Sequence, residues 1–319
     1  MLSRVADSLY WMSRYLERAE HTVRLLDVNM GLMLDRSGTS AEGRWLRVLE
    51  ALGNPPDLEW EGDHIQLVRT LTFDDEHPAS ITACIMSARE NARQVRDELS
   101  TDQWQRLNRL YHQVTEPNMP GNGNQLEEFL PSVLDGLHLF QGITDTTMTH
   151  GEGWQFIQMG RSLERAFATV KLLDIYYHDF FIVSEEAGGN NRYLEWIGLL
   201  RCCTAFEAYC RVYTADLSHE WILEFLLLNS DFPHSVRYCI DGLRQALLSV
   251  RQSSGRLAAD ELSRVAGRLQ SSLNFAEIRE VLEQDTAAYL RGILRQCNQI
   301  HDLIYGYYIH YSVHAALSA

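Results

Sequence analysis

The sequence predicts an all-α protein, a helical bundle built from two internally duplicated halves with approximate two-fold pseudosymmetry. Apolar residues recur at spacings of three and four in nearly every segment, and no segment of useful length alternates with a period of two. Only one of the seven prolines, Pro233, falls in roughly the last third of the chain, which leaves room for long helices. The third observation is an internal repeat between the two halves of the chain.

Individual helices follow from apolar stripes and from the loops between them. The first stripe begins near Val5 and ends near Leu26, and a later one runs from Ile81 to Leu99. We expect helices of roughly 12 to 30 residues, packed as antiparallel bundles. Segments rich in Gly, Pro, Asn or Ser predict loops at residues 37–42, 54–63, 117–124 and 185–191.

The strongest repeat has an offset of 147 residues. Residues 13–28 and residues 160–175 are identical at ten of sixteen positions. A block that begins at Pro78 recurs from Pro233 at an offset of 155. A weaker match places Trp45 and its apolar neighbours against Trp196 and its neighbours at an offset of 151. Three matches in the same order, with slowly drifting offsets, indicate a duplicated helical unit.

The repeat also predicts the domain organisation. A chain of 319 residues is long enough to bury a sizeable core without disulfides or metals. Two copies of a unit are too few for a solenoid, so we expect the halves to pack on each other within one domain. The predicted domain covers residues 1–319, and its repeat halves cover approximately residues 1–125 and 150–319.

A polar helix face is retained in the repeat together with the apolar face. A solvated face is free to change after a duplication, so its retention indicates that the polar face is also buried against something specific. The retained charged residues are Arg14, Glu17 and Arg18 in the first copy and Arg161, Glu164 and Arg165 in the second.

Two interpretations of these Glu-Arg pairs remain open. In the structural one, Arg14 pairs with Glu17, and Arg161 with Glu164, as i,i+3 neighbours, while each guanidinium can also bridge to a neighbouring helix. In the functional one, the pairs converge near the pseudo-two-fold axis and line a polar cleft. That cleft would bind an anionic or amide-bearing ligand, or Glu17 and Glu164 would supply a general acid or base.

An arginine ridge follows one flank of a predicted helix. Arg89, Arg93 and Arg96 each follow a core position, and the second copy retains Arg244 and Arg251. In an acidic protein such a line can receive phosphate or carboxylate groups. Alternatively, these arginines pair with nearby carboxylates while their stems cover apolar surface.

Other motifs for catalysis or metal binding are weak or absent in the sequence. The phosphate-binding glycine loops, the nucleophile elbow and the zinc-protease motif do not occur. Glu17 and His21 lie one helical turn apart, but Ala168 replaces His21 in the second copy, so we expect no metal. Glu207 and Arg211 form a further i,i+4 pair, which adds Glu207 to the candidate binding residues.

Composition and charge restrict the classes of partner. The formal net charge of -15 argues against non-specific binding of nucleic acid or of an anionic membrane surface. The six cysteines show no metal-type spacing and are interpreted as reduced, buried thiols. The opening residues lack the features of a signal peptide, and no apolar run is long enough to span a membrane. We therefore expect a cytoplasmic location.

Several motifs together resemble one family. They are the opening residues 1–20, the central run Gly160-Arg161-Ser162-Leu163-Glu164-Arg165-Ala166, residues 87–97, Phe206-Glu207-Ala208-Tyr209, and the Phe225-Leu226 and Phe232-Pro233 pairs. In this order they resemble the bacterial alpha-E family over essentially the whole chain, and this resemblance implies an all-helical fold. The family usually has Arg after the proline at Pro233, whereas this chain has His234.

The resemblance also implies a functional setting. Genes of the family typically lie beside, or are fused to, a circularly permuted ATP-grasp protein and a transglutaminase-like protease. This context implies an ATP-dependent amide or peptide ligation system, in which the partner consumes ATP and the chain itself needs no cofactor. The substrate would be a peptide or an amino acid, and the protease would trim or remove the product.

Two hypotheses follow. The first is a non-catalytic partner or scaffold component that binds the substrate peptide or the ligase through its repeated Glu-Arg helices. The second is an enzyme in its own right, with a helical Glu as general acid or base in amide formation or transfer.

Overall fold

In the computed structural model the described residues are 1–34, 40–53, 60–115, 123–181, 189–214, 216–254 and 260–309. All regular elements in these ranges are helical, which confirms the predicted all-α fold. The α-helices are α1 (Ser3–Leu34), α2 (Ala41–Ala51), α3 (His64–Phe73), α4 (Ile81–Gln94), α5 (Thr101–Thr115), α6 (Gly123–Thr147), α7 (Glu152–Tyr176), α8 (Gly189–Cys202), α9 (Phe206–Tyr213), α10 (His219–Leu228), α11 (Val236–Ser254), α12 (Asp260–Asn274), α13 (Ile278–Glu283) and α14 (Thr286–Ile304). Three short helical turns are η1 (Arg96–Glu98), η2 (Tyr177–Phe181) and η3 (Tyr305–Ile309).

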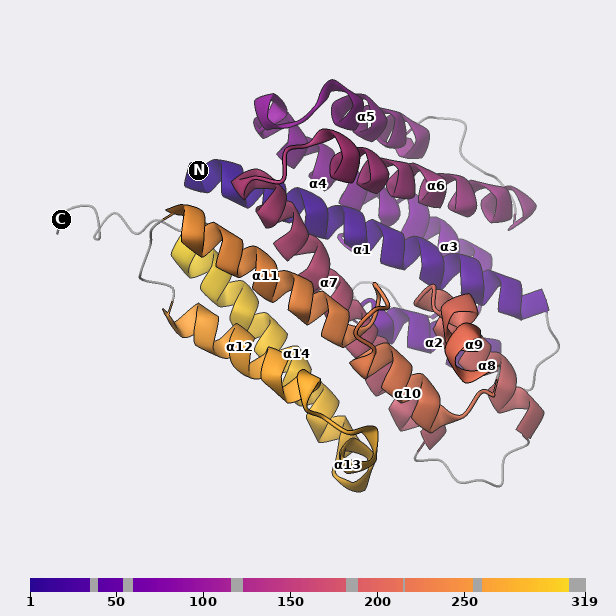
Figure 1. Ribbon diagram of the computed structural model, residues 1–319. Coiled ribbons are helices and arrows are strands. Elements are labelled where there is room, and N and C mark those ends of the chain that lie inside the picture. Colours follow the sequence, from indigo (N-terminus) through magenta and orange to yellow (C-terminus); the bar gives the residue numbers. More distant parts are fainter. Residues whose placement is uncertain are drawn as a thin grey trace.

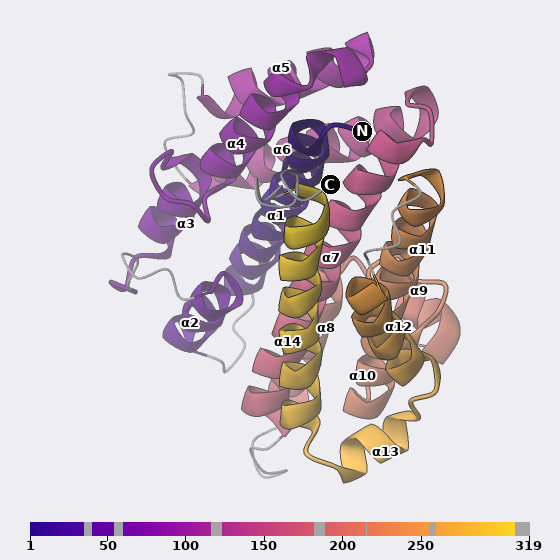
Figure 2. The same cartoon turned by 90° about the vertical axis from the view of Figure 1, so that its left-hand side faces the viewer.

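Helices α1 and α7 form the centre of the molecule. They pack against each other, and each also packs against a set of its own: α4 and α6 on α1, and α11 and α14 on α7. Figure 1 shows α3 to α6 on one side of this central pair and α10 to α13 on the other. The view in Figure 2 shows the same separation, with α14 beside α7.

The starts of several helices are determined by local capping. A Ser or Asp side chain accepts a hydrogen bond from a backbone N–H of the first turn, which satisfies a donor that has no partner within the helix. The capping residues are Ser40 for α2, Asp63 for α3, Ser80 for α4, Ser218 for α10 and Asp285 for α14.

Some predicted element boundaries were wrong. The helices α2, α6 and α8 begin inside segments that were predicted as loops, at Ala41, Gly123 and Gly189. The stripe from Ile81 to Leu99 does not lie on one α-helix, because α4 ends at Gln94 and the chain continues in η1. Helix lengths also range more widely than expected, from 6 residues in α13 to 32 in α1.

The two central helices approach closely at Gly160 of α7. A Cβ atom at this position would overlap with the Ser13 hydroxyl and with the carbonyl oxygen of Tyr10 on α1. Glycine is therefore required by the close approach of the two backbones. Ser13 lies 147 positions before Gly160, so α1 and α7 meet at corresponding positions of the repeat.

Several contacts recur at corresponding positions of the two halves. Thr22 donates to the carbonyl oxygen of Ala79 at 3.4 Å, and Thr169 donates to that of His234 at 3.0 Å. The thiols of Cys84 and Cys239 lie 3.6 and 3.5 Å from the carbonyl oxygens of Pro78 and Pro233, respectively. These matched contacts support the internal duplication. The duplication itself and the bounds of its two halves stay predictions from the sequence.

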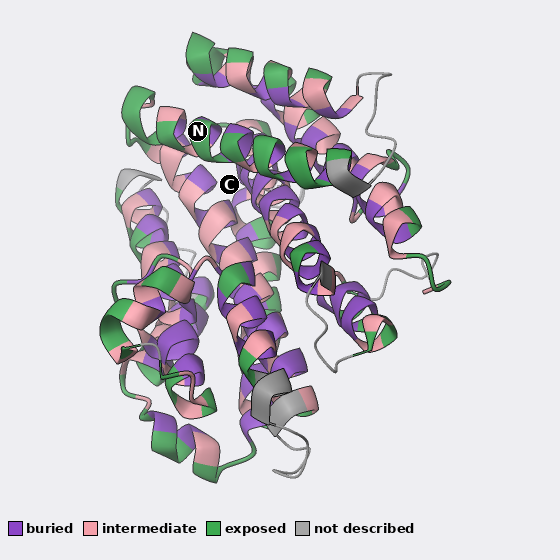
Figure 3. Ribbon diagram, turned by 90° about the vertical axis from the view of Figure 1, so that its right-hand side faces the viewer, coloured by how far each residue is buried: buried purple, intermediate pink, exposed green. Residues whose placement is uncertain are grey.

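The core is continuous through the central helices. Figure 3 shows buried residues along the inward turns and exposed residues along the outward turns of the outer helices. Cys84, Cys202, Cys203, Cys239 and Cys297 are buried and Cys210 is partly buried, and all six carry free thiols. Among the described residues, no helix combines the length and the apolar character that crossing a membrane requires.

Candidate functional site

The two Glu-Arg pairs of the repeat meet each other across the α1/α7 interface. Glu17 of α1 accepts hydrogen bonds from Arg165 of α7, at 2.5 Å from Nε and 3.0 Å from Nη2. The ion pair is bidentate, because it uses both carboxylate oxygens of Glu17. Its side chains are largely buried, at 5% relative exposure for Glu17 and 12% for Arg165.

Glu164 of α7 forms the reciprocal contact. Its Oε1 accepts from Nε of Arg18 at 2.8 Å, and its Oε2 accepts from Nε of Arg14 at 2.6 Å. Arg14 also donates to Nδ1 of His301 on α14, at 3.0 Å. Each helix therefore supplies a buried carboxylate to the arginines of the other, and we call these residues, Arg14, Glu17, Arg18, Glu164 and Arg165, the Glu-Arg lock.

The predicted local i,i+3 pairs were wrong. Arg14 pairs with Glu164 and not with Glu17, and Arg161 pairs with Asp145 of α6 at 3.1 Å. The alternative that the arginines bridge to a neighbouring helix is confirmed, because all five residues of the lock form their ion pairs between α1 and α7. The reason is geometric. The polar faces of α1 and α7 face each other, so each carboxylate lies closer to the arginines of the other helix than to those of its own.

Burial and charge act differently on the two carboxyl groups. Burial raises the pKa of Glu17, and its single arginine partner, Arg165, does not fully offset this effect. Burial also acts to raise the pKa of Glu164, but Arg14 and Arg18 outweigh it and hold that pKa below its ordinary value. The number of arginine partners, together with the negative charge of Glu20 near Glu17, therefore distinguishes two carboxyl groups that occupy corresponding positions.

A second buried ion pair, which the sequence analysis missed, lies between α2 and α8. Arg44 donates to Glu195 at 2.8 Å, and Arg47 donates to the other oxygen of Glu195 at 2.7 Å. Arg44 and Glu195 are 2% and 1% exposed. Arg44 and Glu195 are 151 positions apart and adjoin the repeated tryptophans, so the offset of the third match identifies them as residues that correspond to each other.

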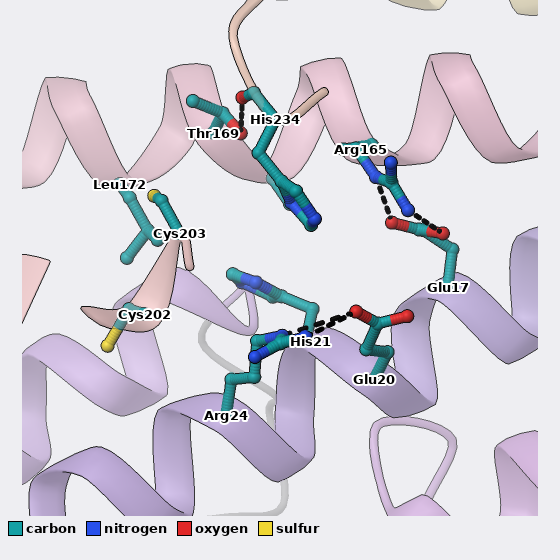
Figure 4. A pocket seen from close by; sticks show the side chains of 11 residues that line it. Glu17, Glu20, His21, Arg24, Arg165, Thr169, Leu172, Cys202, Cys203 and His234 are labelled. Atoms are coloured by element: carbon teal, nitrogen blue, oxygen red, sulfur yellow. Dashed lines mark hydrogen bonds and ion pairs between the residues drawn. The ribbon is translucent and has the colours of Figure 1, made fainter. Parts of the chain in front are cut away.

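A small cavity adjoins the lock between α1, α7 and the residues before α11. Figure 4 shows the imidazoles of His21 and His234 facing each other across it, with Glu20 and Arg24 beside them. Its volume is about 20 Å³, space for roughly one water molecule. The functional interpretation required a ligand-binding cleft here, but this cavity is far too small for a peptide.

The histidines at this cavity are shifted toward their neutral forms. Burial lowers the pKa of His21 to about 4, and the positive charges of Lys171 and Arg24 act in the same direction. Burial and the nearby Arg165 lower the pKa of His234 well below its ordinary value. Both residues were missed as a pair by sequence reasoning, because His21 has no histidine counterpart in the second copy.

We expect His21 to contribute to the loss of stability in acid. Its pKa is about 4 in the folded protein and about 6.5 in an unfolded chain, so between these pH values the unfolded state binds more protons. The free energy of unfolding therefore falls as pH decreases through this window, by up to about 1.4 kcal/mol per pH unit for one proton. Urea unfolding of His21→Ala at a series of pH values should show a shallower slope than the unmodified chain.

A matched control is His112→Ala, which removes an exposed histidine of α5. This variant should keep the slope of the unmodified chain. An unchanged slope in His21→Ala would assign the acid sensitivity to other groups.

The arginine ridge is used differently in the two halves. In the first half, Arg89 donates to Asn108 at 2.7 Å and lies 4.3 Å from the ring centre of Tyr111. Arg93 forms an exposed local pair with Glu90, and Arg96 donates to the carbonyl oxygen of Leu99. In the second half, Arg244 donates to the carbonyl oxygen of Ser263 at 2.6 Å.

The remaining candidates lie away from the lock. Glu207 and Arg211 are both exposed on α9, and the predicted ion pair between them is not formed in the part of the chain that is described. Among the described residues, no group of three or more His, Cys, Asp or Glu side chains is arranged to hold a metal ion. Burial raises the pKa of Cys203, at the small cavity, to about 12, which keeps this thiol protonated near neutral pH.

The fold and the lock define an all-helical protein whose central helices are joined through two Glu-Arg sequences. These are the only two Glu-Arg dipeptides in the chain. The family model for Alpha-E, described as a predicted alpha-helical domain with a conserved ER motif, matches residues 1–309. The chain belongs to the Alpha-E family.

Three relatives are longer proteins from mycobacteria. They are uncharacterized protein Mb2597 of Mycobacterium bovis and uncharacterized proteins MT2643 and Rv2567 of Mycobacterium tuberculosis, each 25% identical over 94% of this chain. The chain spans 36% of the length of each relative, or about a third. No solved structure matches the chain.

Proposed function

We propose that this chain is a non-catalytic partner or scaffold component of an ATP-grasp-dependent amide or peptide ligation system. The family resemblance motivates the ligation system. The longer relatives support a partner role, because the region that matches this chain makes up about a third of each of them. In this proposal the partner ligase consumes ATP in the cytoplasm, the substrate is a peptide or an amino acid, and a transglutaminase-like protease acts on the product.

The Glu-Arg lock is the observation that carries the scaffold role. A general base needs a carboxylate oxygen that can reach the proton it removes. Both oxygens of Glu17 and both oxygens of Glu164 instead accept hydrogen bonds from arginines of the facing helix. The lock therefore suits a rigid connection between the two sides of the scaffold better than proton transfer. In this proposal the ligand or the ligase binds to the outer surface of the bundle.

The alternative function is an enzyme in its own right. One observation favours it: burial raises the pKa of Glu17, which adjoins the small cavity with His21 and His234. A raised carboxyl pKa near a cavity is a feature of general acids and bases. In this alternative Glu17 performs the chemistry and Glu164 only maintains the helix pair.

ADP release by the partner ATP-grasp protein distinguishes these roles. The assay is run over a panel of amino acids, with and without this chain, and complex formation is measured in parallel by co-purification. The scaffold role predicts that the chain binds the ligase and stimulates ADP release. It also predicts that Glu17→Gln loses stimulation only to the extent that it loses folded protein.

Two results would contradict the scaffold role. A Glu17→Gln variant that stays folded and bound to the ligase, yet no longer supports product formation, would establish the catalytic alternative. A chain that neither binds the ligase nor stimulates ADP release would remove the ligation system from consideration. Exposed Glu128→Gln on α6, which is not among the candidate binding residues, provides the charge-matched control and should behave like the unmodified chain.

A further inference from the structure

A pocket of about 540 Å³ lies at one end of the molecule, where α10 and α13 contact each other (Figure 2). Pockets of this size bind small molecules in many proteins. Three carboxylates and two guanidinium groups line it, which gives the lining a net charge of -1. These charged residues are Glu220, Glu224, Glu277, Arg237 and Arg279.

The opposite charges in this pocket do not neutralise each other by direct contact. Within the described residues, none of the five charged side chains forms an ion pair. Arg237 donates from Nη1 to the carbonyl oxygen of Leu228 at 3.4 Å, and its Nε has no hydrogen-bond partner in the described part of the chain. A ligand can therefore bind to these charges without breaking an internal ion pair.

Two aromatic rings adjoin the carboxylates at the start of α10. The ring centres of Tyr213 and Trp221 are 5.0 Å apart, with an angle of 32° between the ring planes. Trp221 is 39% exposed, and the hydroxyl of Tyr213 donates to Glu224 at 3.1 Å. Ring faces and carboxylates both attract cations. This end of the pocket is therefore suited to an ammonium or guanidinium group.

Arg237 lies toward the other end of the same helix. Its hydrogen bond to Leu228 places the guanidinium beside the last turn of α10. Leu228 follows Glu224 by four residues and Glu220 by eight, which corresponds to about 6 and 12 Å along the helix axis. The pocket is therefore polarised, and a ligand that satisfies both ends carries a cation and a carboxylate joined by a flexible chain.

The carboxylates of α10 are not required for the packing of this helix. The helices α3 and α10 begin at corresponding positions, 155 residues apart, and both have ten residues. In α3 the residues that correspond to Glu220 and Glu224 are Ile65 and Arg69. The same helix thus forms without these carboxylates in the first half, which indicates a separate role for them in the second.

We propose that this pocket binds a basic amino acid, either free or at the carboxyl end of a peptide. The side-chain cation lies between the aromatic rings and the carboxylates of Glu220 and Glu224, and the carboxylate of the ligand pairs with Arg237. The four-carbon stem of lysine joins the two charges. The negative lining complements the net positive charge of lysine, and Glu277 is available for its α-ammonium group.

This inference goes beyond the proposed function, because it requires no ATP-grasp partner. Binding is measured on this chain alone, so a negative result would leave the proposed partnership with a ligase untouched. Conversely, a chain that binds no ligase would still be expected to bind lysine.

Ligand-observed NMR titrations of the unmodified chain test the proposal with matched probes. L-lysine carries both charges, L-norleucine lacks the side-chain cation, and L-lysinamide lacks the carboxylate. We expect lysine to bind at least about tenfold more tightly than norleucine, and equal affinity for these two probes would overturn the proposal. The tripeptide Gly-Gly-Lys identifies the source of the ligand. Tighter binding than lysine indicates a peptide end, and weaker binding indicates the free amino acid.

Two substitutions test the two ends of the pocket separately. Glu220→Gln should weaken lysine binding by about threefold and leave norleucine binding unchanged, because only lysine has the side-chain cation. Arg237→Gln should weaken lysine binding by about threefold and leave lysinamide binding unchanged, because only lysine has the carboxylate. An equal loss for lysine and lysinamide in Arg237→Gln would contradict the assigned role of Arg237.

Glu280→Gln is the matched control variant. Glu280 is exposed on α13 and does not belong to the pocket lining, and its replacement changes the net charge as Glu220→Gln does. It should leave lysine affinity unchanged, and circular dichroism should show that all three variants are folded. A loss in Glu280→Gln equal to that in Glu220→Gln would overturn the proposal. The comparison of lysine with norleucine remains decisive even if a variant fails to fold.

Discussion

Replacing Glu164 by glutamine is expected to lower the free energy of unfolding by about 3–5 kcal/mol. The carboxylate of Glu164 is the shared partner of Arg14 and Arg18, and its side chain is only 10% exposed. Glutamine has nearly the same shape but no charge, so Arg14, which is 12% exposed, would keep its burial without its counter-charge, and the more exposed Arg18 would lose its carboxylate partner. Urea unfolding followed by circular dichroism measures the change.

Two comparisons make this prediction specific. Glu90→Gln removes one partner of an exposed Glu-Arg pair on α4 and should leave the unfolding midpoint unchanged, because exposed pairs contribute little. Replacing Glu164 together with both of its arginine partners, as Arg14→Met, Arg18→Met and Glu164→Leu, should destabilise the protein less than Glu164→Gln alone, since this substitution leaves no arginine of the triad without its counter-charge. A Glu164→Gln variant as stable as Glu90→Gln would show that the lock does not hold the helices together.

Replacing Glu195 by glutamine is expected to have an effect of similar size, about 3–5 kcal/mol. Glu195 accepts hydrogen bonds from both Arg44 and Arg47, and its side chain is only 1% exposed. Arg44 is 2% exposed, so it has no path to solvent when its counter-charge is removed. The same unfolding measurement applies, with the midpoint shifting to lower urea concentration.

Glu207→Gln is the control for Glu195→Gln. It makes the same chemical change at an exposed position on α9, only twelve residues along the chain. We expect little change in stability from this substitution. If Glu195→Gln matched this control, the Arg44–Glu195 contact would have to be energetically neutral in spite of its burial.

Both results bear on the interpretation of functional assays. A substitution in the Glu-Arg lock can abolish activity by unfolding the chain as well as by removing a chemical group. Stability measured on the same protein preparation separates the two causes, because a scaffold residue affects function in proportion to the folded fraction. Assays of Glu17→Gln therefore need the unfolding data beside them.

Much of the fold was predictable from periodicity alone. Helical spacing of apolar residues depends on local geometry, so it identified α1 and α4 without any knowledge of their partners, and the repeat of residues 13–28 at residues 160–175 indicated α7. The boundaries were harder, because the starts of α6 and α8 lie in segments whose composition is typical of loops. Composition is a weaker determinant of a helix boundary than capping and tertiary packing.

The residues of the candidate site were predictable, but most of their partners were not. Retention of Glu17 and Glu164 in the repeat identified a buried polar face. An i,i+3 pair within one helix and a pair between two helices have the same sequence pattern, so the sequence left the choice between them open. The opposite charges of Arg44 and Glu195 at matched positions were an overlooked indication that corresponding residues face each other.

The sequence by itself determined the all-helical class, the family and the buried polar face, because each depends on local periodicity or on motifs along the chain. Tertiary structure alone decided the partners of these charges. The close approach at Gly160 brings two similar helix faces together, and each carboxylate then finds its arginines on the opposite helix. Tertiary structure also decided that the guanidinium of Arg89 is covered by the ring of Tyr111, because the two side chains come from different helices, α4 and α5.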